Sequence, residues 1–240
     1  MPKNSFFQFK QFTIHQDQCA MKVCTDACVL GAWVDVSAGK RVLDIGAGTA
    51  LLSLMLAQRN GGAKIDSVEL DESAFEQAVQ NVAGSKFKDN IKVFHCSIQA
   101  YLPNGQYDCI ISNPPFFQSD LRSPNASKNI AHHADSLSFS DLIAAVDRLI
   151  TPEGSFHILL PVDESKVFRK MAEDLKWFVS KKLTLYHHSG KKPFREIMTL
   201  SKVELVDTGE INTELCIYEP DGKSYHSQFR ELMKDYYLIF

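Results

Sequence analysis

The chain contains 240 residues, of which 45% are hydrophobic and 23% are charged, and its formal net charge is −3. This length suffices for one large α/β domain with a substantial core, and the composition is that of an ordinary globular protein. The N-terminus lacks the basic-then-apolar pattern of a secretory signal, and the longest apolar runs, such as 156–161, are much shorter than the roughly 18 residues of a membrane span. We therefore predict a soluble, cytoplasmic protein that does not associate with membranes.

Residues 1–38 read as an N-terminal extension. Aromatic and polar residues alternate over 1–20, which predicts a short strand or arm. Residues 25–35 are expected to be helical, with Asp26 as the cap. No repeat, low-complexity tract or long linker follows, so we predict a single domain over residues 1–240.

From Arg41 onward, apolar runs alternate with amphipathic stretches. The apolar runs predict seven strands, at residues 42–45, 65–70, 91–96, 107–112, 155–160, 183–187 and 197–205. The amphipathic stretches predict helices at residues 49–59, 71–82, 140–150 and 164–175, the second capped by Asp71. Strands that alternate with helices form a mostly parallel sheet with helices on both faces. The last two strands, joined by a short polar connection, predict an antiparallel hairpin at one edge of that sheet.

A glycine turn joins the first of these strands to a helix in Val42-Leu43-Asp44-Ile45-Gly46-Ala47-Gly48-Thr49. The glycines let the backbone approach a ligand closely, but Leu51 replaces the third glycine of a dinucleotide site. Asp44 would repel a pyrophosphate and attract a cofactor with a cationic amino-acid end. Glu69 lies 21 residues after the second glycine, where a carboxylate can accept both ribose hydroxyls. With Ser97 placed to touch an adenine ring, these residues indicate S-adenosylmethionine rather than NAD.

The fourth predicted strand ends in Asn113-Pro114-Pro115-Phe116. The prolines stop sheet pairing and fix the backbone at the carboxyl edge of the sheet, where ligands bind in open α/β folds. The Asn113 side-chain oxygen and the Pro114 carbonyl can each accept one N–H of an exocyclic amino group. This favours a pyramidal nitrogen and stabilises the charge that grows as the nitrogen is alkylated, so no strong base is needed beforehand. Phe116 would stack on a planar base. The tetrapeptide predicts methylation of a nucleobase amino group.

Positive charge is concentrated in one part of the chain. Residues 165–202 contain ten Lys or Arg and three Asp or Glu, a net charge of +7, whereas the segments before and after them each carry −5. The predicted hairpin connection contributes Lys191, Lys192 and Arg195. Charge alone leaves two interpretations open, a phosphate-facing surface and a solvated helix face with an exposed hairpin.

The glycine turn and the Asn-Pro-Pro-Phe tetrapeptide together resemble the class I methyltransferases that modify planar amino groups. The ends of the chain resemble a narrower family, the bacterial tRNA (adenine-N6) methyltransferases that act next to the anticodon of a valine tRNA. Residues 9–17, 19–23 and Thr25-Asp26 look like that family's opening, and residues 229–240 look like its ending. The resemblance covers nearly the whole chain.

This resemblance implies a class I methyltransferase (Rossmann-like) fold, S-adenosylmethionine as the cofactor and tRNA as the partner. The extension 1–38 would cover the cofactor site. The residues that would bind the cofactor are Thr25 and Asp26, which close over its methionine end, together with Asp44, Gly46, Gly48 and Glu69. Asn113 and Phe116 would handle the base, and Lys191, Lys192 and Arg195 would contact the RNA. His133, in the polar loop after the tetrapeptide, is a further candidate substrate contact.

Several alternatives stay open. RNA guanine-N2 methyltransferases also carry Asn-Pro-Pro-Phe, so the tetrapeptide does not choose between adenine and guanine. Protein glutamine-N5 methyltransferases usually end the motif in tyrosine and carry a helical N-terminal domain, for which this chain has no room. A non-catalytic RNA-binding protein on the same fold is another reading, against which the intact Asp44, Glu69 and Asn113 argue.

The six cysteines are interpreted as reduced thiols in the core. Cys24 and Cys28 form one close pair, and no second pair completes a metal site. We expect neither a metal nor an obligate protein partner.

Overall fold

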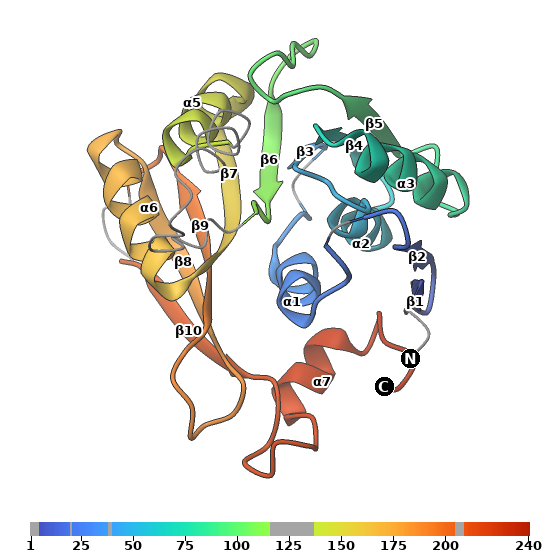
Figure 1. The fold of residues 1–240 in the computed structure, drawn as a ribbon. Coiled ribbons are helices and arrows are strands. Elements are labelled where there is room, and N and C mark those ends of the chain that lie inside the picture. The colour runs from blue at the N-terminus through green and yellow to red at the C-terminus, as the bar shows by residue number, and fades with distance from the viewer. Residues whose placement is uncertain (1–4, 20, 38–39, 116–136, 205–208) are drawn as a thin grey trace, which may run out of the picture.

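The computed structural model describes residues 5–19, 21–37, 40–115, 137–204 and 209–240, which form an α/β fold around one large sheet (Figure 1). The strands are β1 (Phe6–Gln8), β2 (Thr13–His15), β3 (Arg41–Ile45), β4 (Lys64–Glu69), β5 (Ile91–His95), β6 (Tyr107–Ser112), β7 (Ile150–Pro161), β8 (Phe178–Tyr186), β9 (Arg195–Ser201) and β10 (Ile211–Cys216). The helices are α1 (Thr25–Trp33), α2 (Leu51–Arg59), α3 (Glu72–Ala83), α5 (Phe139–Leu149), α6 (Val162–Asp174) and α7 (Ser227–Met233). Within the described ranges, no helix has the length and apolar character needed to cross a membrane.

The main sheet has eight strands in the order β10-β8-β9-β7-β6-β3-β4-β5. Strands β7, β6, β3, β4 and β5 are parallel, so their carboxyl ends meet along one edge. β3 is the first strand of this sheet in the chain, and its two neighbours in the sheet are β4 on one side and β6 on the other. Open α/β sheets bind ligands at such a point, beyond the carboxyl ends of the strands.

The predicted antiparallel hairpin is present, but it does not form the edge of the sheet. β9 pairs antiparallel with both β7 and β8, and β10 then pairs parallel with the outer side of β8. The prediction of seven strands is therefore one short. The first four residues of β10 are exposed, so this strand lacks the apolar run that identifies a buried strand, and pairing with β8 alone defines it.

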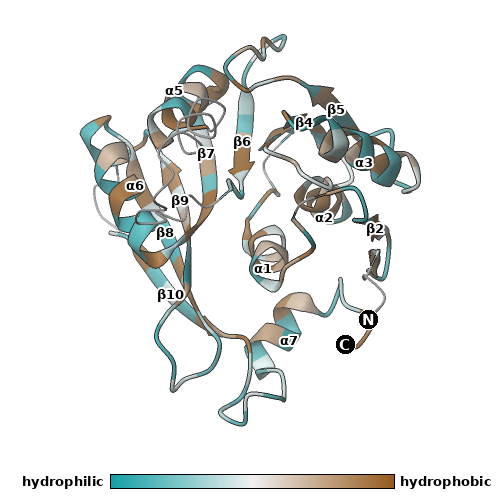
Figure 2. Cartoon of the chain, viewed as in Figure 1, coloured by the Kyte–Doolittle hydropathy of each residue, from teal (hydrophilic) through white to brown (hydrophobic). Residues whose placement is uncertain are grey.

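Helices cover both faces of the sheet, as predicted (Figure 1). One core cluster joins α1, α2 and α3 to the face that contains Val42 and Cys109, and the other joins α5 and α6 to the face that contains Leu43 and Ile110. Neighbouring residues of a strand thus point to opposite sides. Figure 2 shows the corresponding colouring, with apolar residues along the strands and hydrophilic residues on the outward surfaces of α3 and α6.

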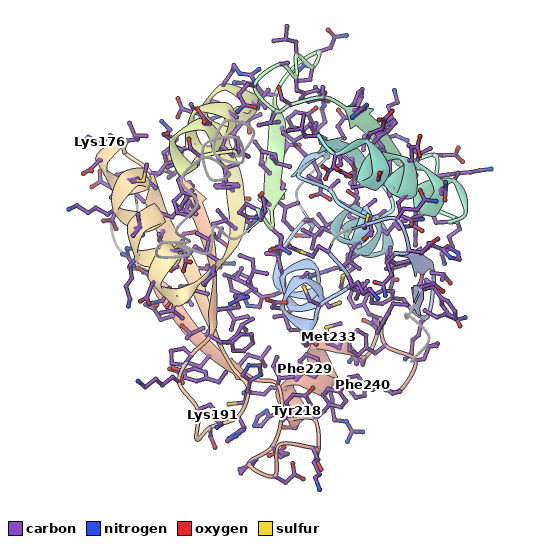
Figure 3. All side chains as sticks on the ribbon, viewed as in Figure 1. Lys176, Lys191, Tyr218, Phe229, Met233 and Phe240 are labelled. Atoms are coloured by element: carbon purple, nitrogen blue, oxygen red, sulfur yellow. The ribbon has the colours of Figure 1, made fainter. Side chains whose placement is uncertain are left out.

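Described residues near the two ends of the chain lie side by side, since Phe9 forms an isolated antiparallel bridge with Tyr237. The predicted N-terminal strand is confirmed as the antiparallel pair β1 and β2. Lys10 Nζ donates hydrogen bonds to the backbone oxygens of Lys234 at 2.5 Å and Phe240 at 2.6 Å. Phe229, in α7, is fully buried and belongs to the same core cluster as Phe9 and Tyr237 (Figure 3). The N-terminal extension is therefore packed on the C-terminal segment.

The two predicted helix caps have different outcomes. Asp71 caps α3 and accepts a hydrogen bond from Ala74 N at 2.8 Å, as predicted. Asp26 does not cap α1, because the cap is Cys24 and Asp26 lies in the first turn. Its carboxylate instead accepts a hydrogen bond from Arg195 Nε, 169 residues further along the chain. No local pattern could reveal that partner.

Candidate active site

The glycine turn lies between β3 and α2 at the carboxyl edge of the sheet. Gly46 and Gly48 have positive φ angles of 73° and 56°, which disfavour any other residue. A Cβ added to either glycine would meet no heavy atom within 4 Å. Gly46 N and Ala47 N donate to the carbonyl of Val68 at 2.9 and 3.1 Å. The turn is thus held on β4 and has open space beside its glycines, so a ligand can approach the backbone there.

Asp44 is fully buried beneath this turn. Its Oδ2 accepts hydrogen bonds from the Ser53 hydroxyl at 2.7 Å and the Ser53 N–H at 3.2 Å. Its Oδ1 is buried and has no hydrogen-bond partner among the described residues. Burial raises the pKa of Asp44 to about 6. An unpartnered buried carboxylate oxygen is costly, and a cationic ligand group would relieve that cost.

Glu69, at the end of β4, binds the glycine turn directly. Its Oε2 accepts from Gly48 N at 2.7 Å, and its Oε1 accepts from Leu70 N and Asp71 N at 2.7 and 2.8 Å. The two acids singled out in the sequence are thus brought to one turn. Leu70, which the sequence analysis does not single out, is an apolar side chain that is 53% exposed directly after Glu69. The signal in the sequence was an apolar residue directly after the acid that ends the second predicted strand.

Ser97 lies at the same edge, just beyond β5. The neighbouring Cys96 N donates to the carbonyl of Glu69 at 3.1 Å, which fixes this segment beside β4. Ser97 Oγ accepts a hydrogen bond from Ala100 N at 3.2 Å and so closes a turn. Its position is compatible with a contact to the cofactor, and its hydroxyl already has a structural role.

Asn113 is adjacent to the glycine turn. In the register of β3 with β6, Ile45 pairs with Ser112, so the next residues of the two strands, Gly46 and Asn113, leave the sheet side by side. Ser112 Oγ also donates to the carbonyl of Ile45 at 2.9 Å. Asn113 Oδ1 is buried and has no hydrogen-bond partner in the part of the chain that the structure describes. Pro114 is buried, whereas Phe116 and His133 lie outside the described residues.

The remaining predicted site residues form a second group. The Thr25 side chain hydrogen-bonds with that of Tyr237, and Asp26 Oδ2 accepts from Arg195 Nε at 3.0 Å. Asp26 was predicted at the cofactor and Arg195 at the RNA, yet the two side chains bind each other. Lys191 and Lys192 are exposed in the connection between β8 and β9.

The cysteines show no arrangement for catalysis. All six are free, and burial raises the pKa of Cys24, Cys28 and Cys109 to about 12, so these thiols stay protonated. Over the described ranges, no group of three or more His, Cys, Asp or Glu side chains could hold a metal ion.

Comparison with known proteins agrees with this geometry. Residues 20–141 match the family model of the methyltransferase small domain. The chain is 55% identical over 240 residues, the full length of both chains, to the tRNA1(Val) (adenine(37)-N6)-methyltransferase of Dyadobacter fermentans. It is 42% identical, over 98% of each chain, to the protein with the same name from Trichodesmium erythraeum.

Solved structures support the fold. A predicted O-methyltransferase from Agrobacterium tumefaciens has a TM-score of 0.66 at 15% identity, over 88% of this chain and 96% of the other. Pyrococcus horikoshii TYW2, solved in complex with MeSAdo, has a TM-score of 0.58 at 15% identity, over 85% of this chain and 74% of the other. The strand order, the glycine turn with its two acids and the full-length identity lead to one conclusion. The chain belongs to the family of the tRNA1(Val) (adenine(37)-N6)-methyltransferases, within the class I S-adenosylmethionine-dependent methyltransferase fold.

Proposed function

We propose that this protein methylates the exocyclic N6 of an adenine in tRNA, at the position for which its relatives are named, adenine 37 of tRNA1(Val). The observation that carries this proposal is that Asn113, which follows the partner of Ile45 and so leaves the sheet next to the glycine turn, has a buried Oδ1 with no hydrogen-bond partner among the described residues. An acceptor in that place can orient an amino group toward a ligand held by the turn. We also propose that residues 1–240 act as one domain.

The cofactor site that we propose fits S-adenosylmethionine, which when bound supplies an electrophilic methyl group on a sulfonium. Gly46 and Gly48 leave open space for it, and the free buried oxygen of Asp44 suits its cationic amino group. Glu69 would accept the ribose hydroxyls after exchanging some of its backbone donors. Ser97, together with Leu70, would border the adenine ring.

The nucleobase that receives the methyl group would be held by Asn113 and Pro114. Asn113 Oδ1 and the Pro114 carbonyl would each accept a hydrogen bond from one N–H of its amino group. These bonds pyramidalise the nitrogen and stabilise the positive charge that develops on it as the new C–N bond forms. The methylated nitrogen then loses its proton to solvent, so the chain needs no strong base. Phe116 would stack on the base and His133 would touch the substrate.

The N-terminal extension, residues 1–38, would cover the methionine end of the cofactor through Thr25 and Asp26. This role is supported by its packing: α1 lies against α2, and Thr25 and Asp26 are held by Tyr237 and Arg195. Lys191 and Lys192 would bind tRNA phosphates. Arg195, at the start of β9, would assist these lysines in binding phosphates while its bond to Asp26 anchors the end of the connection between β8 and β9. We place the reaction in the cytoplasm, with tRNA as the partner.

Methylation of a tRNA1(Val) transcript by the purified protein tests this proposal. After incubation with S-adenosylmethionine, digestion and mass spectrometry should reveal N6-methyladenosine, absent from a transcript with guanosine at position 37. Formation of N2-methylguanosine would favour the guanine alternative, and an unmodified transcript despite measurable cofactor binding would favour a non-catalytic RNA-binding protein.

A further inference from the structure

A parallel pair of rings stands at the base of the connection between β8 and β9. The ring centroids of His187 and Phe194 are 4.1 Å apart, and the planes differ by only 8°. His187 directly follows β8, and Phe194 directly precedes β9. Phe194 is partly buried and packs on the core, whereas His187 is exposed. The pair therefore has an anchored inner ring and an accessible outer ring.

Backbone hydrogen bonds hold the main chain of the two residues that carry these rings. Phe194 N donates to the carbonyl of Leu185 at 3.0 Å, and Tyr218 N donates to the carbonyl of His187 at 2.8 Å. Between them, Lys191 N donates to the carbonyl of His188 at 3.0 Å. A ring that is carried by such a backbone and is stacked on a second ring loses little conformational freedom when a ligand stacks on it.

The surroundings of the rings suit an anionic polymer. Residues 187–194 contain Lys191 and Lys192 and no Asp or Glu, and both lysines are exposed. Figure 3 shows Lys191 on this connection, at the lower left of the molecule. Proteins bind single-stranded nucleic acids by this combination, in which aromatic or histidine rings stack on bases and nearby cations hold the phosphates.

The connection between β8 and β9 also lies at the edge formed by the carboxyl ends of the parallel strands, where the candidate active site is located. Arg195 pairs with Pro161 at the end of β7, three residues beyond Ile158, which pairs with Ser112. The start of β9 is thus two strands from Asn113, or roughly 10 Å across the sheet. An RNA segment that delivers a base to Asn113 would pass this connection.

We propose that the pair of His187 and Phe194 is a binding platform for one unpaired nucleobase of the substrate RNA, distinct from the adenine that is methylated. The base stacks on the outer face of His187, and Lys191 and Lys192 hold the phosphates beside it. This inference rests on the proposed function for the identity of the RNA. It adds a subsite that fixes the register of the RNA relative to Asn113.

Binding of an RNA hairpin with the anticodon stem and loop of tRNA1(Val) tests the platform. By fluorescence anisotropy, His187→Ala should raise the Kd for this RNA about tenfold, and His187→Tyr, which keeps a stacking ring, should restore most of the affinity. The KM for S-adenosylmethionine and the melting temperature should not change. Lys223→Ala, in a different exposed turn, is the control and should bind the RNA as the unaltered protein does.

A second set of RNAs identifies the stacked base. Each unpaired loop position other than the target adenine is replaced in turn by an abasic nucleotide. At one position, the loss of affinity seen with the unaltered protein should vanish with His187→Ala, because both changes remove the same contact. An unchanged Kd for His187→Ala, or losses that multiply at every position, would overturn the platform. Failure of the unaltered protein to methylate a full-length tRNA1(Val) transcript would instead contradict the proposed function, since the binding measurements do not depend on turnover.

Discussion

Arg195 and Asp26 bind each other across the fold. Arg195 Nε lies 3.0 Å from Asp26 Oδ2, and the two side chains are only 26% and 10% exposed. Arg195 begins β9 and Asp26 lies in the first turn of α1, so the pair ties the basic connection of the hairpin to the N-terminal helix. Two parts of the chain that the resemblance assigns to RNA and to cofactor are thereby fixed relative to each other.

We expect this ion pair to stabilise the fold. Asp26→Asn and Arg195→Gln should each lower the free energy of unfolding, because each removes one charge of a partly buried ion pair. In a double-mutant cycle measured by urea denaturation, the coupling energy should be about 1 kcal/mol, at the upper end for partly exposed pairs. Strictly additive effects would show that the two charges do not interact in solution.

Asn113 should matter for turnover and little for the cofactor. Asn113→Ala removes an acceptor that would act only on the amino group that receives the methyl, so kcat should fall about 100-fold or more while the Kd for S-adenosylmethionine stays nearly constant. Asn104→Ala, in an exposed turn at the opposite end of the strands, is the matched control. Equal losses of kcat and cofactor affinity would refute the role given to Asn113.

Cofactor affinity should depend on the protonation of Asp44. Burial raises the pKa of this carboxyl from its ordinary value of 3.8 to about 6. Ionisation of the buried carboxyl therefore lowers the stability of the fold as the pH rises from about 3.8 to about 6. Below about pH 6 most molecules carry a neutral Asp44, which cannot pair with a cation. By calorimetry, the Kd for S-adenosylmethionine should increase about tenfold between about pH 7 and about pH 5. Asp44→Asn should bind weakly with no such dependence, and Asp221→Asn, on the surface, should retain it. An identical pH profile in Asp44→Asn would exclude Asp44 as the cause.

Buried His157 should make the fold sensitive to acid. Burial lowers the pKa of His157 from 6.5 to about 3, and its ring nitrogens bond to the hydroxyls of Ser155 and Thr199. The unfolded chain takes up a proton near pH 6.5 and the folded chain does not, so stability is complete above about pH 6.5 and falls toward about pH 3. Between about pH 6.5 and about pH 5 this loss is about 2 kcal/mol. In urea denaturation, His157→Gln should show a smaller decline over that interval, and an equal decline would assign the effect to other groups.

The basic connection should account for part of the salt dependence of RNA binding. Replacing Lys191 and Lys192 with Ala should weaken tRNA binding and reduce the slope of log Kd against log salt by about 1 to 2, since each phosphate contact releases a counterion. The control is the pair Lys86→Ala and Lys88→Ala, two exposed lysines that are separated by one residue before β5. An unchanged slope would leave these lysines as ordinary solvated residues.

The sequence by itself determined the features that depend on neighbouring residues. Turn geometry and helix capping are decided within a few residues. For this reason the sequence predicted the strand, glycine turn and helix from Arg41 to Arg59, and also the Asp71 cap. The alternation of apolar runs with amphipathic stretches likewise predicted a mostly parallel sheet with helices on both faces. These local rules therefore predicted the α/β fold class.

Only the tertiary structure decided which distant residues meet. The register of Ile45 with Ser112 puts Asn113 beside Gly46, and the pairing of β10 with β8 forms a strand whose exposed residues give no apolar signal. The bond between Asp26 and Arg195 joins residues 169 positions apart. Such contacts depend on how the packed elements are placed in space, and side-chain patterns within a segment do not encode the partner that packing brings to it.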